Sequence, residues 1–233
     1  DNFGNVVISG MYQSGPTDLN PGPATNTVTC YGYSDYYIVK LDCNGNYLWA
    51  NSYGSPERDG ITDLAVSQSG DIYFGSYINA GCASIDLDAG PGTFNYTGCG
   101  GYIVKIGPTG NFIWANTSVN IPYRICLVNN TVQWLINYSA GTQSLNFYDA
   151  NSGILQQSTF LNNPIVSAIS SKTNSIVYMT GTFNGTANIA PGSNIFNVAS
   201  NGNYDAYVSK IGVCDMSVPS NTVQLCLGTP QVL

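Results

Sequence analysis

One unit of sequence occurs twice in the first half of the chain, and this repeat limits the possible folds more than any other feature. The segment DYYIVKLDCNGNYLWANSYG at residues 35–54 is matched by GGYIVKIGPTGNFIWANTS at 100–118. Lys40 and Lys105 occupy the same place in the two copies, and YDAYVSKIG at 204–212 begins a later copy with Lys210 in that place. Repetition of this kind is typical of folds in which each repeat packs on its neighbours.

Each copy also contains an earlier strand-like segment: GNVVISGMY, GDIYFGSYI and SIVYMTGTF, beginning at residues 4, 70 and 175. A shorter copy at 122–161 has four such segments in about 40 residues, which is the size of one propeller blade. We therefore predict an all-β β-propeller with about four visible four-stranded blades that form part of a larger ring, since the visible repeats do not close one. The predicted blades span about 1–55, 61–118, 122–161 and 166–213, and residues 214–233 form a linker or the start of an Ig-like β module.

The turns and the large side chains fit this fold. Five hairpin turns, DNFGN, CNGN, SQSGD, PTGN and ANSG, place a glycine where a tight hairpin needs a positive φ. We expect Trp49 and Trp114 to fill the space between blades, with stacking on carbohydrate as the alternative. The repeated lysines are expected to bury their stems and to reach solvent or a backbone carbonyl.

The charge and the composition argue against several functions. The net charge is −7 with six Lys and Arg residues, so no basic patch is available for nucleic acid or an anionic membrane. The absence of histidine excludes Ser-His-Asp and Cys-His nucleophiles and His-ligated zinc. No apolar run approaches the roughly 18 residues of a membrane span, and we expect no insertion into a membrane. The abrupt opening without a signal peptide is typical of a mature or fragmentary piece of a longer protein.

Seven cysteines indicate an oxidising compartment, and the odd number leaves at least one thiol free or paired elsewhere. We predict the disulfide Cys82–Cys99, because both residues flank one insertion, and Cys214–Cys226 as a second. Cys126 lies in an apolar strand and is expected to be buried as a thiol. No spacing is Cys-x-x-Cys, so a zinc ribbon is not expected.

The insertion between the second and third strands of the longer blades is a candidate calcium site. It reads IDLDAGPGTFN at 85–95, TDLNPGPATN at 17–26 and ANIAPGSNIFN at 187–197. Carboxylates two positions apart on an extended chain point the same way, and Ca²⁺ prefers oxygen ligands. The alternative is that these side chains cap turns, which the third copy favours because it has no carboxylate. The candidate ligands are Asp18, Asn20, Asp86 and Asp88, and no other cofactor is expected.

Tyrosines among Asn and Ser residues are candidate contacts for a sugar or a protein, because each joins a flat apolar ring to a polar tip. The alternative is packing between strands. For glycoside hydrolysis a pair of carboxylates must flank the sugar, and neither Asp59 nor Asp63 stands out as a member of such a pair. We therefore expect no enzymatic activity. The candidate ligand-binding residues are Tyr12, Tyr31, Tyr33, Tyr53 and Tyr77.

The pattern GNVVISG…DLNPGP…DYYIVKLDCNGNYLWANSYG, with its second copy, resembles the SBBP-type β-propeller repeat. The resemblance covers about residues 1–213, and its most specific part is the YIVKLDxxGNxxWA core; the third blade departs from it. The tail VQLCLGTPQVL is similar to the opening of Ig-like modules. The resemblance implies a large secreted or cell-surface protein of Bacteroidota, commonly exported by the type IX pathway and linked to adhesion or gliding motility. It implies no reaction.

The function expected from this resemblance is that of a non-enzymatic module of an adhesin-like surface protein. Its partners would be a surface glycan or a protein, bound through blade-end loops, or other domains of the same polypeptide. The alternative is a structural spacer with no ligand of its own. A polysaccharide-active hydrolase is a third and weaker interpretation.

Overall fold

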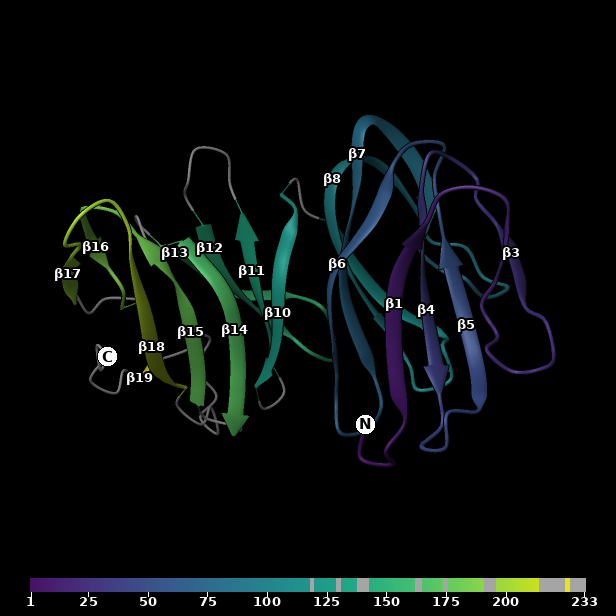
Figure 1. Cartoon of the computed structure of the whole chain (residues 1–233), viewed down its shortest axis with the longest axis horizontal. Coiled ribbons are helices and arrows are strands. Elements are labelled where there is room, and N and C mark those ends of the chain that lie inside the picture. Colours follow the sequence, from purple (N-terminus) through teal and green to yellow (C-terminus); the bar gives the residue numbers. More distant parts are fainter. Residues whose placement is uncertain are drawn as a thin grey trace. The chain divides into compact units, whose positions relative to one another are not determined.

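The computed structural model describes residues 1–117, 120–128, 131–137, 143–161, 165–173, 176–190, 196–213 and 225–226. Within these residues the regular secondary structure consists of β-strands, so the predicted all-β class is confirmed for the part of the chain that is described. The chain forms two compact units, Asp1–Pro122 and Tyr123–Leu233, and each is described by itself (Figure 1).

The first unit contains two antiparallel sheets. One has three strands in the order β1-β4-β5, and the other has four in the order β6-β7-β8-β9. A small pair, β2 and β3, follows β1. The bounds are Val6–Tyr12 (β1), Pro16–Asp18 (β2), Thr27–Thr29 (β3), Asp35–Leu41 (β4), Tyr47–Tyr53 (β5), Asp59–Val66 (β6), Ile72–Asp86 (β7), Asn95–Ile106 (β8) and Phe112–Thr117 (β9).

The second unit contains two four-stranded sheets, β10-β11-β12-β13 and β14-β15-β18-β19, and the small pair β16-β17. The bounds are Pro122–Val128 (β10), Thr131–Asn137 (β11), Gln143–Asp149 (β12), Leu155–Leu161 (β13), Ile165–Thr173 (β14), Ile176–Phe183 (β15), Thr186–Asn188 (β16), Asn197–Ala199 (β17), Asp205–Val213 (β18) and Leu225–Cys226 (β19).

The sequence repeat is also a repeat of strand register. The conserved lysine position pairs with Val7 across β1 and β4, with Tyr73 across β7 and β8, and with Tyr178 across β15 and β18. Three sheets of the described chain have four strands, whereas the sheet of β1, β4 and β5 has no counterpart of β6, β10 or β14. Closure of these sheets into a ring, with the blade limits given above, stays a prediction.

The core of the first unit lies between its two sheets and is rich in aromatic rings. Tyr36 stacks on Tyr53 with ring centroids 5.1 Å apart, and Phe74 lies 6.0 Å from Tyr36 and 5.5 Å from Tyr53. The Tyr36 and Tyr102 hydroxyls are 3.0 Å apart, so the polar tips of these buried rings satisfy each other. Strands that bury both faces explain the nearly continuous apolar runs in the repeat.

The core of the second unit is built from smaller aliphatic side chains around Phe147 and Phe183. Its members come from both four-stranded sheets and from Ala187 and Ile189 of the third insertion. Cys126 is buried there on β10, as predicted, with its Sγ 3.9 Å from the Leu127 carbonyl oxygen.

The five turn glycines confirm the expected hairpins. Gly4, Gly45, Gly70, Gly110 and Gly153 have φ values of 77°, 84°, 88°, 85° and 69°. In the turns that open at Asp1 and Asp42, the aspartate Oδ1 accepts the amide hydrogens of the residues two and four positions later. Each of these two turns is therefore stabilised both by an aspartate cap and by a glycine with a positive φ.

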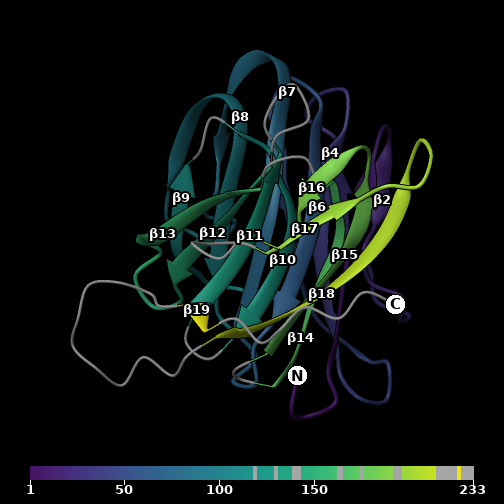
Figure 2. The same cartoon turned by 90° about the vertical axis from the view of Figure 1, so that its left-hand side faces the viewer.

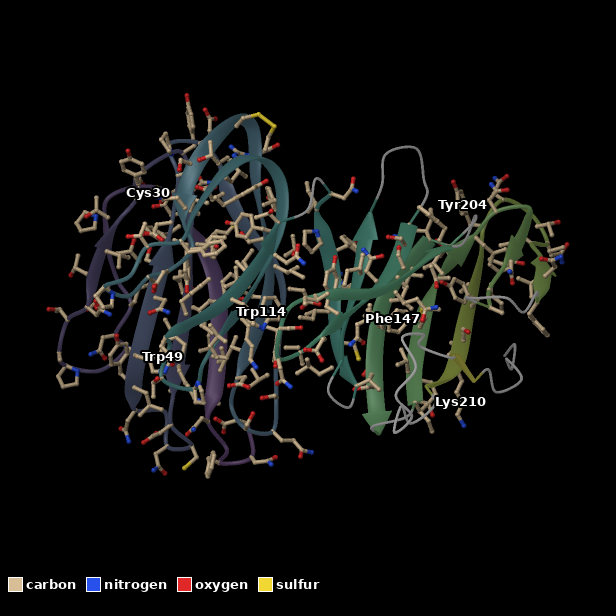
Figure 3. The ribbon with its side chains drawn as sticks, turned by 180° about the vertical axis from the view of Figure 1, so that it is seen from behind. Cys30, Trp49, Trp114, Phe147, Tyr204 and Lys210 are labelled. Carbon is tan, nitrogen blue, oxygen red and sulfur yellow. A yellow bond between two sulfur atoms is a disulfide. The ribbon has the colours of Figure 1, made fainter. Side chains whose placement is uncertain are left out.

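The disulfide Cys82–Cys99 joins β7 to β8, and the prediction of this pair is confirmed. The two strands extend beyond the rest of their sheet, as Figures 1 and 2 both show. The sulfur bridge lies within this extension (Figure 3), at the irregularity between the pairs Ile78–Gly100 and Ala83–Gly98. Cys214 lies outside the described residues, so its pairing with Cys226 stays a prediction. In the part of the chain that is described, we find no helix of sufficient length and hydropathy for a membrane span.

Candidate functional site

The three insertions between the second and third strands share one hydrogen-bonded loop. Its first polar side chain is Asp18, Asp86 or Asn188, and in each copy the Oδ1 atom accepts two backbone N–H groups, two and eight residues further on. The pairs are Asn20 and Asn26 to Asp18 (3.0 and 2.8 Å), Asp88 and Phe94 to Asp86 (3.0 and 2.8 Å), and Ala190 and Phe196 to Asn188 (3.1 and 2.9 Å).

The residue after each capping side chain points the other way, into the core. Leu19, Leu87 and Ile189 are all buried, and Leu87 has no exposed surface. In each insertion, therefore, one side chain caps the loop through hydrogen bonds and the next is buried in the core.

This geometry bears on the calcium prediction. Asn188 makes the same two hydrogen bonds as the aspartates, so the loop needs a side-chain oxygen and not a charge. Asn20 and Asp88 likewise accept the amide hydrogens of Gly22 and Gly90. Among the described residues no three His, Cys, Asp or Glu side chains converge as metal ligands. The oxygens of the loops fit turn capping better than the cage of six to eight ligands that Ca²⁺ takes.

Tyr31 and Tyr33 are the most exposed of the candidate tyrosines, at 71% and 74%. The loop that carries them is held tightly: the Tyr31 amide donates to Asp35 Oδ2 at 2.7 Å, and the Tyr33 amide donates to the Glu57 carbonyl oxygen at 3.2 Å. Between them, Gly32 lies so close to the backbone of 55–57 that a Cβ there would overlap the Ser55 carbonyl oxygen. The structure thus presents two solvated rings on a fixed backbone.

The other three candidate tyrosines are packed. Tyr53 belongs to the aromatic core, and Tyr12 is buried with its hydroxyl 2.6 Å from Ser52 Oγ. Tyr77 is half-buried, and its hydroxyl lies against Gly60, where a Cβ would be 2.7 Å away. The structure therefore does not bring all five tyrosines to one surface, because three of them fill space within the first unit.

The second unit has a corresponding segment, residues 201–205, in which Tyr204 stands at the place of Ser34. Asp205 occupies the register position of Asp35, and its Oδ2 accepts the Asn201 amide hydrogen at 2.7 Å. Gly202 has the place of Gly32, and Asn201 and Asn203 have the places of the two tyrosines. The aspartate cap is shared, but the two backbones differ. Gly202 has a φ of 132° and open space where a Cβ would be, whereas Gly32 has no positive φ and lies against residues 55–57.

Two acidic side chains lie beneath the Tyr31–Tyr33 loop of the first unit. Asp35 and Asp59 are both buried, and the amide and hydroxyl groups of Ser55 donate to the Asp59 carboxylate. Burial raises the pKa of Asp59 to about 6, and the charges of Asp35 and Glu57 add to this effect. Because both carboxylates are shielded from solvent, they are not placed to flank a polysaccharide. The repetition of Asp35 as Asp205 was the sequence signal that could have identified this support.

The pKa of Asp59 predicts a pH-dependent stability. The native state holds the Asp59 proton up to about pH 6, whereas an unfolded aspartate releases it near 3.8. The free energy of unfolding should therefore fall as the pH rises between these values, by about 1–2 kcal/mol once solvent screening is allowed for. Chemical denaturation at a series of pH values measures this slope.

Asp59→Asn should remove that component of the pH dependence, because an amide keeps an acceptor for Ser55 and has no proton to lose in this range. Asp63→Asn, on the same strand, is the matched control and should leave the slope in place. An unchanged slope in Asp59→Asn would show that another group is responsible.

The repeated lysines have partners that the sequence did not indicate. Lys40 Nζ donates to the Pro108 carbonyl oxygen at 3.2 Å, which confirms the expected carbonyl contact, and it also lies 3.0 Å from Asp1 Oδ2. Lys105 Nζ is 3.1 Å from Asp71 Oδ2. Asp1 and Asp71 lie in the turns before β1 and β7, but they occupy different positions of the repeat.

Comparison with known proteins supports the repeat fold alone. No protein-family model matches the chain. It is similar to an uncharacterised WD repeat-containing protein of Acanthamoeba polyphaga mimivirus, with 23% identity over 159 residues. The match covers 63% of this chain and 11% of the viral protein. WD repeats form four-stranded propeller blades, so the likeness agrees with a β-propeller-like repeat fold.

Proposed function

We propose that this chain is a non-enzymatic binding module of an extracellular, adhesin-like protein, built from SBBP-type β-propeller repeats. It binds a surface glycan or protein through the Tyr31–Tyr33 loop. The observation that carries the proposal is the display of two exposed rings on a loop that is fixed by Asp35 and by the backbone of 55–57. An aromatic ring left in solvent gives up the stabilisation that its burial would provide, and a tyrosine side chain loses little conformational entropy on binding.

Several further features support an extracellular site. The disulfide Cys82–Cys99 is typical of proteins that fold in an oxidising compartment. The surface has few charged residues, 8% of the chain, so contacts with a partner would rest on rings and neutral polar groups. Export by the type IX pathway and a bacterial cell-surface location belong to the same proposal and rest on the repeat resemblance.

The test is binding of the chain to an immobilised panel of bacterial and plant polysaccharides. The double variant Tyr31→Asn and Tyr33→Asn removes both rings. The rings are exposed and the loop is held through its backbone amides, so the loop should still fold. We expect its affinity to fall by about thirtyfold, as for the loss of an aromatic hot spot. Tyr204→Asn is the control, since Tyr204 is 64% exposed and lies in the corresponding segment of the second unit.

A structural spacer without a ligand is the second candidate function. It is favoured by the packing of Tyr12, Tyr53 and Tyr77 and by the use of the insertion side chains as turn caps. Absence of binding across the panel would favour the spacer. Binding that survives in the double variant would place the ligand away from the tyrosine loop and contradict the proposal.

A further inference from the structure

A hollow of about 510 Å³ lies at the end of the first unit opposite the tyrosine loop. Figure 3 shows Trp49 toward this end of the strands and Cys30, next to Tyr31, toward the other. Its volume falls within the roughly 300–1,000 Å³ of small-molecule sites. Its lining is largely apolar, with Phe3, Leu48, Trp49 and Pro108, and it includes the neutral polar side chains of Asn5, Ser69 and Thr109.

The indole of Trp49 is held in a fixed orientation. Its Nε1–H donates to the Pro108 carbonyl oxygen at 3.0 Å, and Gly110 lies against the ring, where a Cβ would be 3.1 Å from Cδ2. These contacts come from the turn between β8 and β9, so the second sheet sets the position of a ring from the first. A ring held in this way can meet a ligand without first losing conformational freedom.

The equivalent tryptophan of the second sheet has no such open surface. Trp114 is only 9% exposed and packs against Tyr73, with ring centroids 6.1 Å apart. The residue in the place of Tyr73 is Val7, which pairs with Lys40 as Tyr73 pairs with Lys105. Valine has no ring to lay against Trp49, and Trp49 remains half-buried at the edge of the hollow.

The two charged side chains of the hollow form an ion pair, and the terminal ammonium of Asp1 donates to the Asn5 carbonyl oxygen. Lys40 Nζ lies 3.0 Å from Asp1 Oδ2, and their side chains are 3% and 0% exposed. The ammonium also donates to the Pro108 carbonyl oxygen. Because the two side-chain charges are already paired, neither is free to compensate for the desolvation of a charged ligand.

We propose that this hollow is a binding site for one ring of a neutral sugar. The apolar face of a pyranose would lie on Trp49 and Phe3, and its hydroxyl groups would meet the polar side chains of Ser69 and Thr109. Aromatic surface with a few neutral hydrogen-bonding groups is the chemistry that such a ring requires. The site is separate from the Tyr31–Tyr33 loop and does not depend on the function proposed for that loop.

The test is a titration of the full chain with the methyl glycosides of glucose, galactose, mannose and N-acetylglucosamine, followed by the indole N–H signals in NMR spectra. We expect at least one neutral glycoside to shift the Trp49 indole signal in a saturable manner. Methyl glucuronide and methyl glucosaminide, which carry a charge on the same ring, should bind at least tenfold more weakly. Trp49→Phe assigns the signal.

Phe3→Ala tests the site with little risk to folding, because Phe3 is 74% exposed. We expect it to weaken the neutral glycoside by at least tenfold, whereas Phe160→Ala, at a phenylalanine that is 63% exposed in the second unit, should leave binding unchanged. Absence of a shift with every neutral glycoside, or equal binding of the charged ones, would overturn the proposal. The Tyr31→Asn and Tyr33→Asn variant should keep this binding, so failure of one site is distinguishable from failure of the other.

Discussion

Leu87→Ala should destabilise the chain by about 2–5 kcal/mol, the usual cost of a cavity at a fully buried leucine. Leu87 has no exposed surface and packs in the same cluster as Phe74 and Tyr102. Asp86→Asn, one position earlier, should change the free energy of unfolding by less than about 0.5 kcal/mol, as for a surface position. The reason is that Asn188 already serves as this cap in the third insertion. Denaturation followed by tryptophan fluorescence measures both variants.

The same experiment with calcium separates capping from metal binding. A metal held by Asp86 and Asp88 would stabilise the native state by about 2.7 kcal/mol at one hundred times its dissociation constant. We expect calcium and EDTA to leave the unfolding midpoint unchanged. A midpoint that rises with calcium in the wild type and not in Asp86→Asn would contradict the capping interpretation.

The features that the sequence predicted correctly are those encoded locally. A hairpin turn is specified by its own glycine, so Gly4, Gly45 and Gly110 could be assigned without knowledge of the rest of the fold. The pair Cys82–Cys99 followed from two cysteines that flank one hairpin extension. The repeat of 35–54 at 100–118 then carried each local assignment to a second place in the chain.

The features that it missed depend on contacts between repeats. Tyr53 ends a strand and resembles a loop residue in the sequence, yet its ring is buried because it packs against both Tyr36 and Phe74. The pair of Lys40 and Asp1 could not be inferred from that of Lys105 and Asp71, because the aspartates stand at different positions of the turn. The WD-repeat likeness does not supply such contacts, since it agrees with the fold without fixing the packing of individual side chains.

In the candidate site, too, the sequence predicted the local features and missed those that depend on contacts between distant segments. The sequence placed Tyr31 and Tyr33 near a loop, and the structure confirms that both rings are exposed. What the sequence did not reveal is the support of that loop, which comes from Asp35 on one strand and from the backbone of 55–57 between the sheets. The repetition of Asp35 as Asp205 hints at the first contact, but the contact with 55–57 joins two separate segments and leaves no signal in a linear pattern.

Gly32→Ala should therefore abolish ligand binding at the tyrosine loop without removing either ring. Its Cβ would overlap the Ser55 carbonyl oxygen and lie 2.6 Å from that of Glu57, and these are backbone atoms that cannot rotate away. We expect a loss of stability of about 2–3 kcal/mol, as for an overpacked site, and displacement of Tyr31 and Tyr33. Binding to the polysaccharide panel and denaturation measure the two effects.

Gly202→Ala is the matched control, because Gly202 holds the equivalent place in the second unit and a Cβ there has nothing within 4 Å. Its φ of 132° is unfavourable for alanine, so a smaller loss of about 1 kcal/mol is expected, with binding unchanged. If Gly32→Ala bound the ligand as tightly as the wild type, the tyrosines would not need the fixed backbone. Their exposure would then be the property that matters, because a flexible loop could present the same two rings at a higher cost in entropy.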